Sequence, residues 1–197
     1  MILDLAALRP ARLLLASLGL AGALCGPALG KAAHDAPALA AARDPVADCD
    51  RLAAWAPDPE RRAEPVAGPA LAAEAARAAC VAAVARRPDL ARLRLQLARA
   101  LWRQGEEAVA YALLEQAAQQ GSPAAWLVLG ALFDEGRHVR QDDVVALLHY
   151  LEAARRGAPE GMRAAAGIWG DPASPSHDAR LAAMAPGTLE AAVLSDW

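Results

Sequence analysis

One pattern occurs twice in this chain, at a fixed spacing of 36 residues. The segment that begins at Gln116 reads Gln-Ala-Ala-Gln-Gln-Gly-Ser-Pro, and the one that begins at Glu152 reads Glu-Ala-Ala-Arg-Arg-Gly-Ala-Pro. A period in this range is typical of stacked helix pairs, in which each unit contacts its neighbours along the chain. We therefore expect repeated helical hairpins.

The composition favours the same fold class. Alanine, leucine and arginine are abundant, aromatic residues make up 4%, and β-branched residues are scarce. Such a mixture favours helices, because these side chains lose little conformational freedom there. The net charge of −3 argues against nucleic acid as a partner. The prediction is an all-α protein.

Prolines, glycines and acidic residues indicate where six helices begin and end. Pro88, Gly105, Gly121 and Gly157 stand at helix boundaries, and Asp89 precedes the second helix as an N-cap. The connections are short, so neighbouring helices should be antiparallel. The predicted helices span 69–87, 90–104, 106–121, 123–135, 142–157 and 159–170.

The first 30 residues have the pattern of an export signal. Arg9 and Arg12 precede an uncharged run, 13–30, which ends in small residues where a signal peptidase cleaves. Two alternatives remain open, a retained membrane anchor and a lipid-modified Cys25. We expect a periplasmic or secreted protein that contacts the membrane only through an uncleaved signal, if at all.

Cleavage would leave two cysteines, Cys49 and Cys80. Two cysteines in an exported protein suggest one structural disulfide, and the alternative is two free thiols. Asp48 and Asp50 flank Cys49 and would raise its thiol pKa, which disfavours a reactive thiolate.

Two segments flank the repeats. We expect 31–47 to be a tether and 48–68 to be irregular, with one turn of helix near 50–55, because prolines are closely spaced there. Within 171–197, short helices are expected over 181–184 and 189–194. These would cap the repeat domain, 69–170; the alternative is a segment that orders on binding.

From Leu97 onward, the spacing of small and large residues resembles a tetratricopeptide repeat, and the next unit resembles the Sel-one-like branch of that superfamily, of an exported bacterial type. The first unit carries Leu97, Ala98, Leu101, Gly105, Ala110, Leu114 and Ala117. The second carries Leu129, Gly130, Leu132, Phe133, Gly136, Val139, Asp142, Ala146, Tyr150, Ala153, Ala154 and Gly157. The resemblance implies a short α-solenoid of antiparallel helix pairs.

The resemblance has two further consequences. His138 stands where the family has glycine, and a histidine fits poorly if that position needs a positive φ. The helix over 69–87 aligns with the second helix of a unit, which implies that its first helix has been lost. The segment tethered by Cys49 would then cover the apolar face left behind.

No catalytic constellation is evident, and no cofactor is expected. Metal-capable side chains do cluster along the sequence, but His149 lies where the family packs a large aromatic residue, and the rest read as a solvated loop. We therefore expect no metal site. The cluster contains Asp134, Glu135, His138, Asp142, Asp143 and His149.

The resemblance places the first helix of each pair on a concave surface, where a cationic strip beside a tryptophan would bind an acidic peptide. The alternative is an ordinary solvated helix face with Trp102 in the core. The expected function is a non-catalytic scaffold for an unidentified envelope protein or peptide. A cell-wall-fragment or β-lactam binder or hydrolase is the alternative. The groove would contain Arg92, Arg99, Trp102, Arg103, Asp134 and Arg163.

Overall fold

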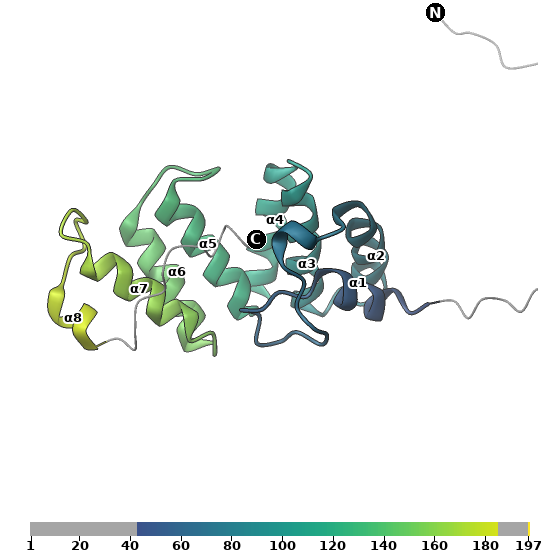
Figure 1. Cartoon of the computed structure of the whole chain (residues 1–197), viewed down its shortest axis with the longest axis horizontal. Coiled ribbons are helices and arrows are strands. Elements are labelled where there is room, and N and C mark those ends of the chain that lie inside the picture. The colour runs from purple at the N-terminus through teal and green to yellow at the C-terminus, as the bar shows by residue number, and fades with distance from the viewer. Residues whose placement is uncertain (1–42, 185–196) are drawn as a thin grey trace, which may run out of the picture. The chain divides into compact units, whose positions relative to one another are not determined.

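A computed structural model describes residues 43–184 and Trp197 (Figure 1). All described residues belong to one compact unit. They form α-helices and one 3₁₀ turn, without a strand among them. The elements are α1 (Pro45–Ala53), η1 (Gly68–Ala70), α2 (Ala73–Arg86), α3 (Ala91–Arg103), α4 (Glu107–Gln119), α5 (Pro123–Glu135), α6 (Asp143–Arg155), α7 (Glu160–Gly170) and α8 (Ala179–Met184).

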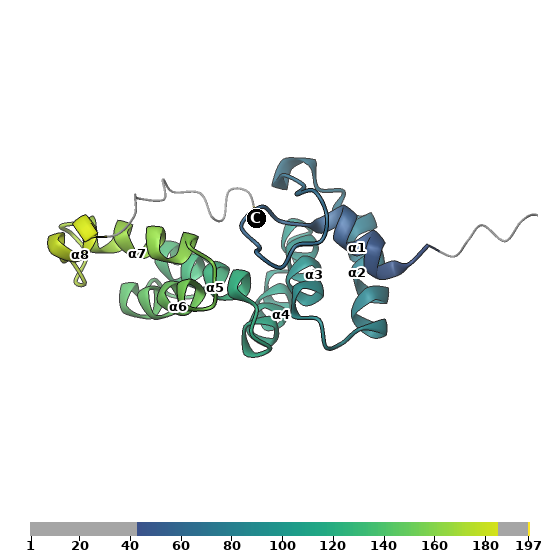
Figure 2. The same cartoon turned by 90° about the horizontal axis from the view of Figure 1, so that it is seen from below.

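Each helix packs on the next one along the chain, as expected for hairpin repeats. The pairs follow one another from α1 and α2 to α7 and α8 (Figures 1 and 2). Helix α1 also contacts α3, so the first pair packs on the second. The predicted all-α fold of antiparallel helix pairs is therefore confirmed for the described residues.

The 36-residue period is visible in the backbone itself. Gly121 and Gly157 occupy equivalent positions and both have φ of 101°, a conformation that favours glycine. The residues that follow them make equivalent bonds, Ser122 N–H to the carbonyl of Ala117 and Ala158 N–H to that of Ala153, each 3.0 Å long. The repeated sequence thus encodes a repeated helix end.

Local capping explains the best-predicted helices. Ser122 caps α5 by accepting a hydrogen bond from the backbone N–H of Ala125, and Pro123 opens the helix. Asp142 caps α6 by accepting from the N–H groups of Val144 and Val145. Gly130 allows α6 to approach, since a β-carbon there would lie 2.5 Å from a ring carbon of Tyr150.

The N-terminal segment differs from the prediction. Residues 45–53 form a regular helix, α1, opened by Pro45 and capped by the side chain of Asp44. The first pair therefore has a short first helix rather than a lost one. The predicted opening at Pro69 is also wrong, because Pro69 lies in η1 and α2 begins at Ala73.

The C-terminal predictions are met in part. Helix α8 covers the first predicted short helix, whereas the second, over 189–194, lies outside the described residues. Trp197 is packed and only 1% exposed. The predicted export signal also lies outside the described residues. No described helix has the length and apolar character needed to cross a membrane.

Candidate functional site

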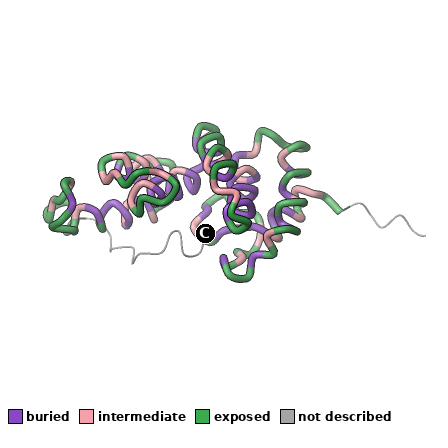
Figure 3. Tube along the Cα trace, turned by 90° about the horizontal axis from the view of Figure 1, so that it is seen from above, coloured by how far each residue is buried: buried purple, intermediate pink, exposed green. Residues whose placement is uncertain are grey.

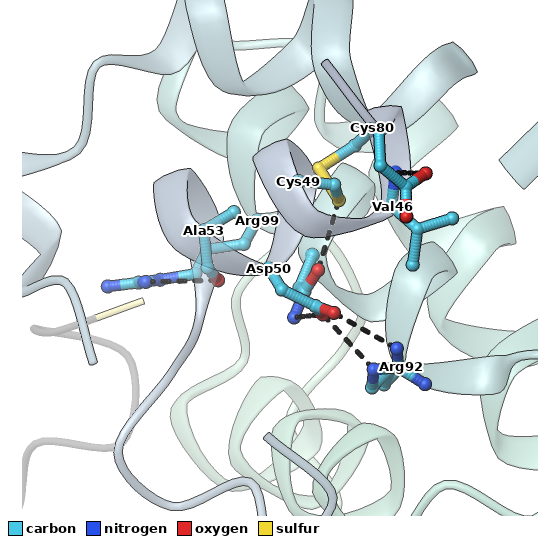
Figure 4. Close-up of a disulfide and its surroundings, with 9 residues drawn as sticks. Val46, Cys49, Asp50, Ala53, Cys80, Arg92 and Arg99 are labelled. Atoms are coloured by element: carbon cyan, nitrogen blue, oxygen red, sulfur yellow. Dashed lines mark hydrogen bonds and ion pairs between the residues drawn. A yellow bond between two sulfur atoms is a disulfide. The ribbon is translucent and has the colours of Figure 1, made fainter. Parts of the chain in front are cut away.

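The face of α3 that was predicted to be a basic groove is covered by the chain's own N-terminal segment. A disulfide between Cys49 and Cys80 fastens α1 to α2, with the two Cα atoms 4.7 Å apart (Figure 4). Both cysteines are fully buried. The predicted bridge is thus present, and it holds α1 where α1 can contact α3.

Arg92 is engaged by α1. Its guanidinium donates two hydrogen bonds to the carboxylate of Asp50, 3.1 and 3.0 Å long, and both side chains are nearly buried (Figure 4). The Gln96 amide donates to the same carboxylate at 3.0 Å, and its oxygen lies 3.0 Å from the Cys49 sulfur. A buried, bidentate pair of this kind fixes the position of α1 on α3.

Arg99 is buried completely. Its guanidinium donates to the backbone oxygens of Ala54, at 3.0 Å, and Val66, at 2.5 Å. These carbonyls belong to the irregular segment after α1, which is closed by a bond from the Val66 N–H to the Ala54 oxygen. Arg99 therefore supplies hydrogen-bond donors to backbone oxygens at the two ends of this loop, and its assignment to an open groove is wrong.

The other predicted groove residues are dispersed. Trp102 is buried, as the alternative interpretation had it, with the guanidinium of Arg137 5.4 Å from its ring centre. Arg103 is exposed. Arg163 pairs with Glu160 one turn earlier on α7, at 2.7 Å. The structure does not bring these side chains together into a cationic strip.

Asp134 instead lines a hollow between the end of α5, the start of α6 and α7, which we call the α5–α7 hollow. Its volume is about 760 Å³. Its carboxylates outnumber its one cationic side chain, Arg140. It is lined by Asp134, Glu135, Arg140, Gln141, Asp142, Asp143, Val144, Tyr150, Ala164, Gly167, Ile168, Asp171, Ala173, Ser174 and Pro175.

Contacts within the hollow fix two of its carboxylates. The Tyr150 hydroxyl donates a hydrogen bond to a carboxylate oxygen of Asp134, 3.0 Å away, and the Ser174 hydroxyl donates one to a carboxylate oxygen of Asp143, 2.5 Å away. Burial raises the pKa of Asp134, and the nearby charges of Asp143 and Asp171 raise it further, whereas the bond from Tyr150 lowers it. The hollow therefore has a negative potential that a cation would relieve.

Two clusters of rings lie outside the hollow. His149 packs between Trp126 and Phe133, with ring centres 5.2 and 5.4 Å away, and burial lowers its pKa. This confirms its predicted packing role.

His138, which stands where the resemblance expects glycine, has φ of 64° and is therefore in the left-handed conformation. Within 43–184 and at 197, no three metal-capable side chains are arranged to hold an ion.

The sequence predicted only one turn of helix near 50–55 and a segment, tethered by Cys49, that covers an apolar face, so it missed the full length of α1 and its contacts with α3. The Asp44-Pro45 start is a recognisable helix signal, and Asp50 beside Cys49 offered a carboxylate for an arginine. Neither indicates which surface α1 would cover, because the partners on α3 lie more than forty positions away.

The chain was compared with family models, curated proteins and solved structures. No family model matches the chain, and no curated protein does. Among solved structures, it is similar to a Sel1 repeat protein from Oxalobacter formigenes, with 21% identity and a TM-score of 0.46 over 52% of this chain and 81% of that one. The chain has a helical-repeat fold.

Proposed function

We propose that this chain is an exported helical-repeat scaffold that binds a protein or peptide segment through the α5–α7 hollow and performs no catalysis. The observation that carries the proposal is the hollow itself. Its volume of about 760 Å³ is in the range of ligand-binding pockets. It lies between consecutive helices of neighbouring pairs, where repeat proteins offer concave binding surfaces.

The lining of the hollow supports a cationic peptide segment. The carboxylate of Glu135 is exposed at the end of α5, and Asp171 is exposed at the end of α7. Val144, which is exposed, supplies apolar surface for the aliphatic part of a lysine or arginine side chain. Electrostatic complementarity of this kind selects a partner and accelerates its approach. This replaces the acidic peptide expected from the sequence.

Defined peptides test the proposal. Labelled peptides of equal length, one rich in lysine and one rich in glutamate, are titrated with the protein, and fluorescence anisotropy is measured. The lysine-rich peptide should bind, more weakly at high salt, and Glu135→Lys should weaken binding about tenfold, which is about 1.4 kcal/mol. Glu74→Lys on α2, which is exposed and distant in sequence, is the matched control. Equal losses in both variants, or no binding at all, would refute the hollow as the site.

The absence of catalysis has a separate test. A labelled penicillin should leave the purified protein unmodified, whereas covalent labelling would favour the alternative of a β-lactam-binding envelope protein. The outcome does not depend on the peptide experiment.

Export is supported by the sequence of residues 1–30 and by the disulfide, since disulfides persist in oxidising compartments. We expect the protein in the envelope or secreted fraction, with a mass that corresponds to cleavage after Gly30. Intact-mass spectrometry of the fractionated protein measures this. An unprocessed chain in the cytoplasm would contradict it.

A further inference from the structure

Trp197 packs against a residue from the other end of the described chain. Its ring centre lies 5.1 Å from that of Trp55, at an interplanar angle of 75°, and each residue is 1% exposed. The marked C-terminal end accordingly lies beside the segment that follows α1 (Figures 1 and 2). An edge-to-face pair of buried tryptophans is a favourable contact.

The Trp55 side of this contact is held in place by contacts that do not involve Trp197. Trp55 directly follows α1, which the disulfide fastens to α2. Arg99 binds the oxygen of Ala54, and the Trp55 carbonyl accepts a bond from the N–H of Asp58 at 3.1 Å. Ala54, Trp55 and Asp58 are buried, whereas most of the residues between Asp58 and Val66 are exposed (Figure 3). Trp55 therefore belongs to a site organised before Trp197 arrives.

The contact leaves polar groups unsatisfied. The indole nitrogens of Trp55 and Trp197 are both buried without a hydrogen-bond partner. The indole of Trp197 is itself a donor, so its ring cannot accept a hydrogen bond from the indole N–H of Trp55. A segment that supplied both a ring and a carbonyl acceptor would satisfy a group that Trp197 leaves unpaired.

We propose that Trp55 and the segment 54–66 form a docking slot for a tryptophan-bearing segment, which the chain's own Trp197 occupies in cis. The contact is thus autoinhibitory: an external segment binds only when Trp197 leaves. This slot is separate from the α5–α7 hollow, and it rests on the Trp55–Trp197 contact alone.

The test uses a labelled peptide of residues 185–197 and the full chain. Anisotropy titrations are made with the wild type and with Trp197→Ala, in which the slot is empty. We expect the variant to bind the peptide at least tenfold more tightly than the wild type. A peptide with alanine in place of the tryptophan should bind neither protein. Equal affinity for both proteins, or no binding to the variant, would overturn the proposal.

Further variants keep the test informative. Adding Trp55→Ala to Trp197→Ala should abolish peptide binding while circular dichroism remains helical. If Trp197→Ala unfolds, Trp197→Phe replaces it and should bind the peptide more tightly than the wild type does. Sedimentation distinguishes cis from trans occupancy. A dimer that requires Trp197 would place that residue on a second copy and would overturn occupancy in cis.

Discussion

Asp58 carries a carboxyl group that is buried where its charged form is disfavoured. It is fully buried, and one of its oxygens accepts a bond from the Glu60 N–H while the other has no partner. Burial raises its pKa from 3.8 to about 6, despite the opposing effect of that bond and of the positive charges of Arg92 and Arg61. The folded state therefore holds the proton more tightly than the unfolded state does.

This gives a pH-dependent prediction. The contribution of Asp58 to stability should fall as pH rises from about 4 to about 6 and stay constant above, because only the folded state resists ionisation in that window. The Asp58→Asn variant should lack this fall, and at pH 8 its free energy of unfolding should exceed that of the wild type by about 1–2 kcal/mol. The gain is smaller than the pKa shift of Asp58 implies, because the asparagine amide would still be buried with an unpartnered polar atom. Urea unfolding at pH 4 and pH 8 measures the difference between the two proteins. An equal difference at both pH values would rule the explanation out.

His138 has a strained backbone conformation and a side chain that contacts two aromatic rings. Its φ of 64° is unfavourable for a side chain, yet its ring lies near those of Trp102 and Tyr111, with centres 6.4 and 5.3 Å away, and near the Glu107 carboxylate at 3.8 Å. These contacts fasten the loop after α5 to α3 and α4. The aromatic contacts explain why a histidine is accepted at a position that favours glycine.

A pair of variants separates these two effects. His138→Ala loses the ring and keeps the strain, whereas His138→Gly loses both. The glycine variant should therefore be more stable than the alanine variant by about 1 kcal/mol, as measured by thermal unfolding. Equal stability would show that the backbone at this position is not strained.

Among the elements, α1 depends most on distant parts of the chain. It has nine residues, too few for an isolated helix to be stable in water. Its stability comes from the disulfide to α2 and from the bonds that Arg92 and Gln96 make to Asp50.

The disulfide prediction follows from this dependence. Cys49→Ala with Cys80→Ala should cost about 3–4 kcal/mol, the chain-entropy value for a loop of about 30 residues. Exchange of backbone amides should rise over 44–66 and stay slow over α4 to α6. Reduction of the wild type should reproduce that pattern, and a uniform rise along the chain would contradict the local role of the bridge.

The same contrast explains what the sequence could predict. Helices α3 to α7 follow the predicted limits closely, because Ser122, Asp142 and the glycines act within a few residues of themselves. Leu97 and Leu101, which the resemblance assigned to a repeat unit, are buried in α3, but Gln96 and Arg99 are buried there too. Those residues contact α1 and the segment after it, so their burial is a non-local property. The predicted basic groove on α3 is wrong for that reason, whereas Asp134, also predicted as a groove residue, lines the α5–α7 hollow.

At the scale of the molecule, each helix packs mainly on its neighbours in sequence. In such an array, stability is close to a sum of units and of the interfaces between them. An array of this kind frays from its ends, and the last units exchange first. The contact between Trp55 and Trp197 is an exception, because it links the first pair to the end of the sequence.

That link changes how the array should come apart. A linear row of units loses its terminal members one at a time, whereas the contact between Trp197 and Trp55 adds an interaction that is lost when the first pair unfolds. Trp197→Ala should therefore broaden the thermal transition and speed deuterium uptake over α7 and α8, with α4 least affected. An unchanged transition width would show that the join carries no cooperativity. If the width does change, a single pair of tryptophans makes helices at opposite ends of the sequence unfold together.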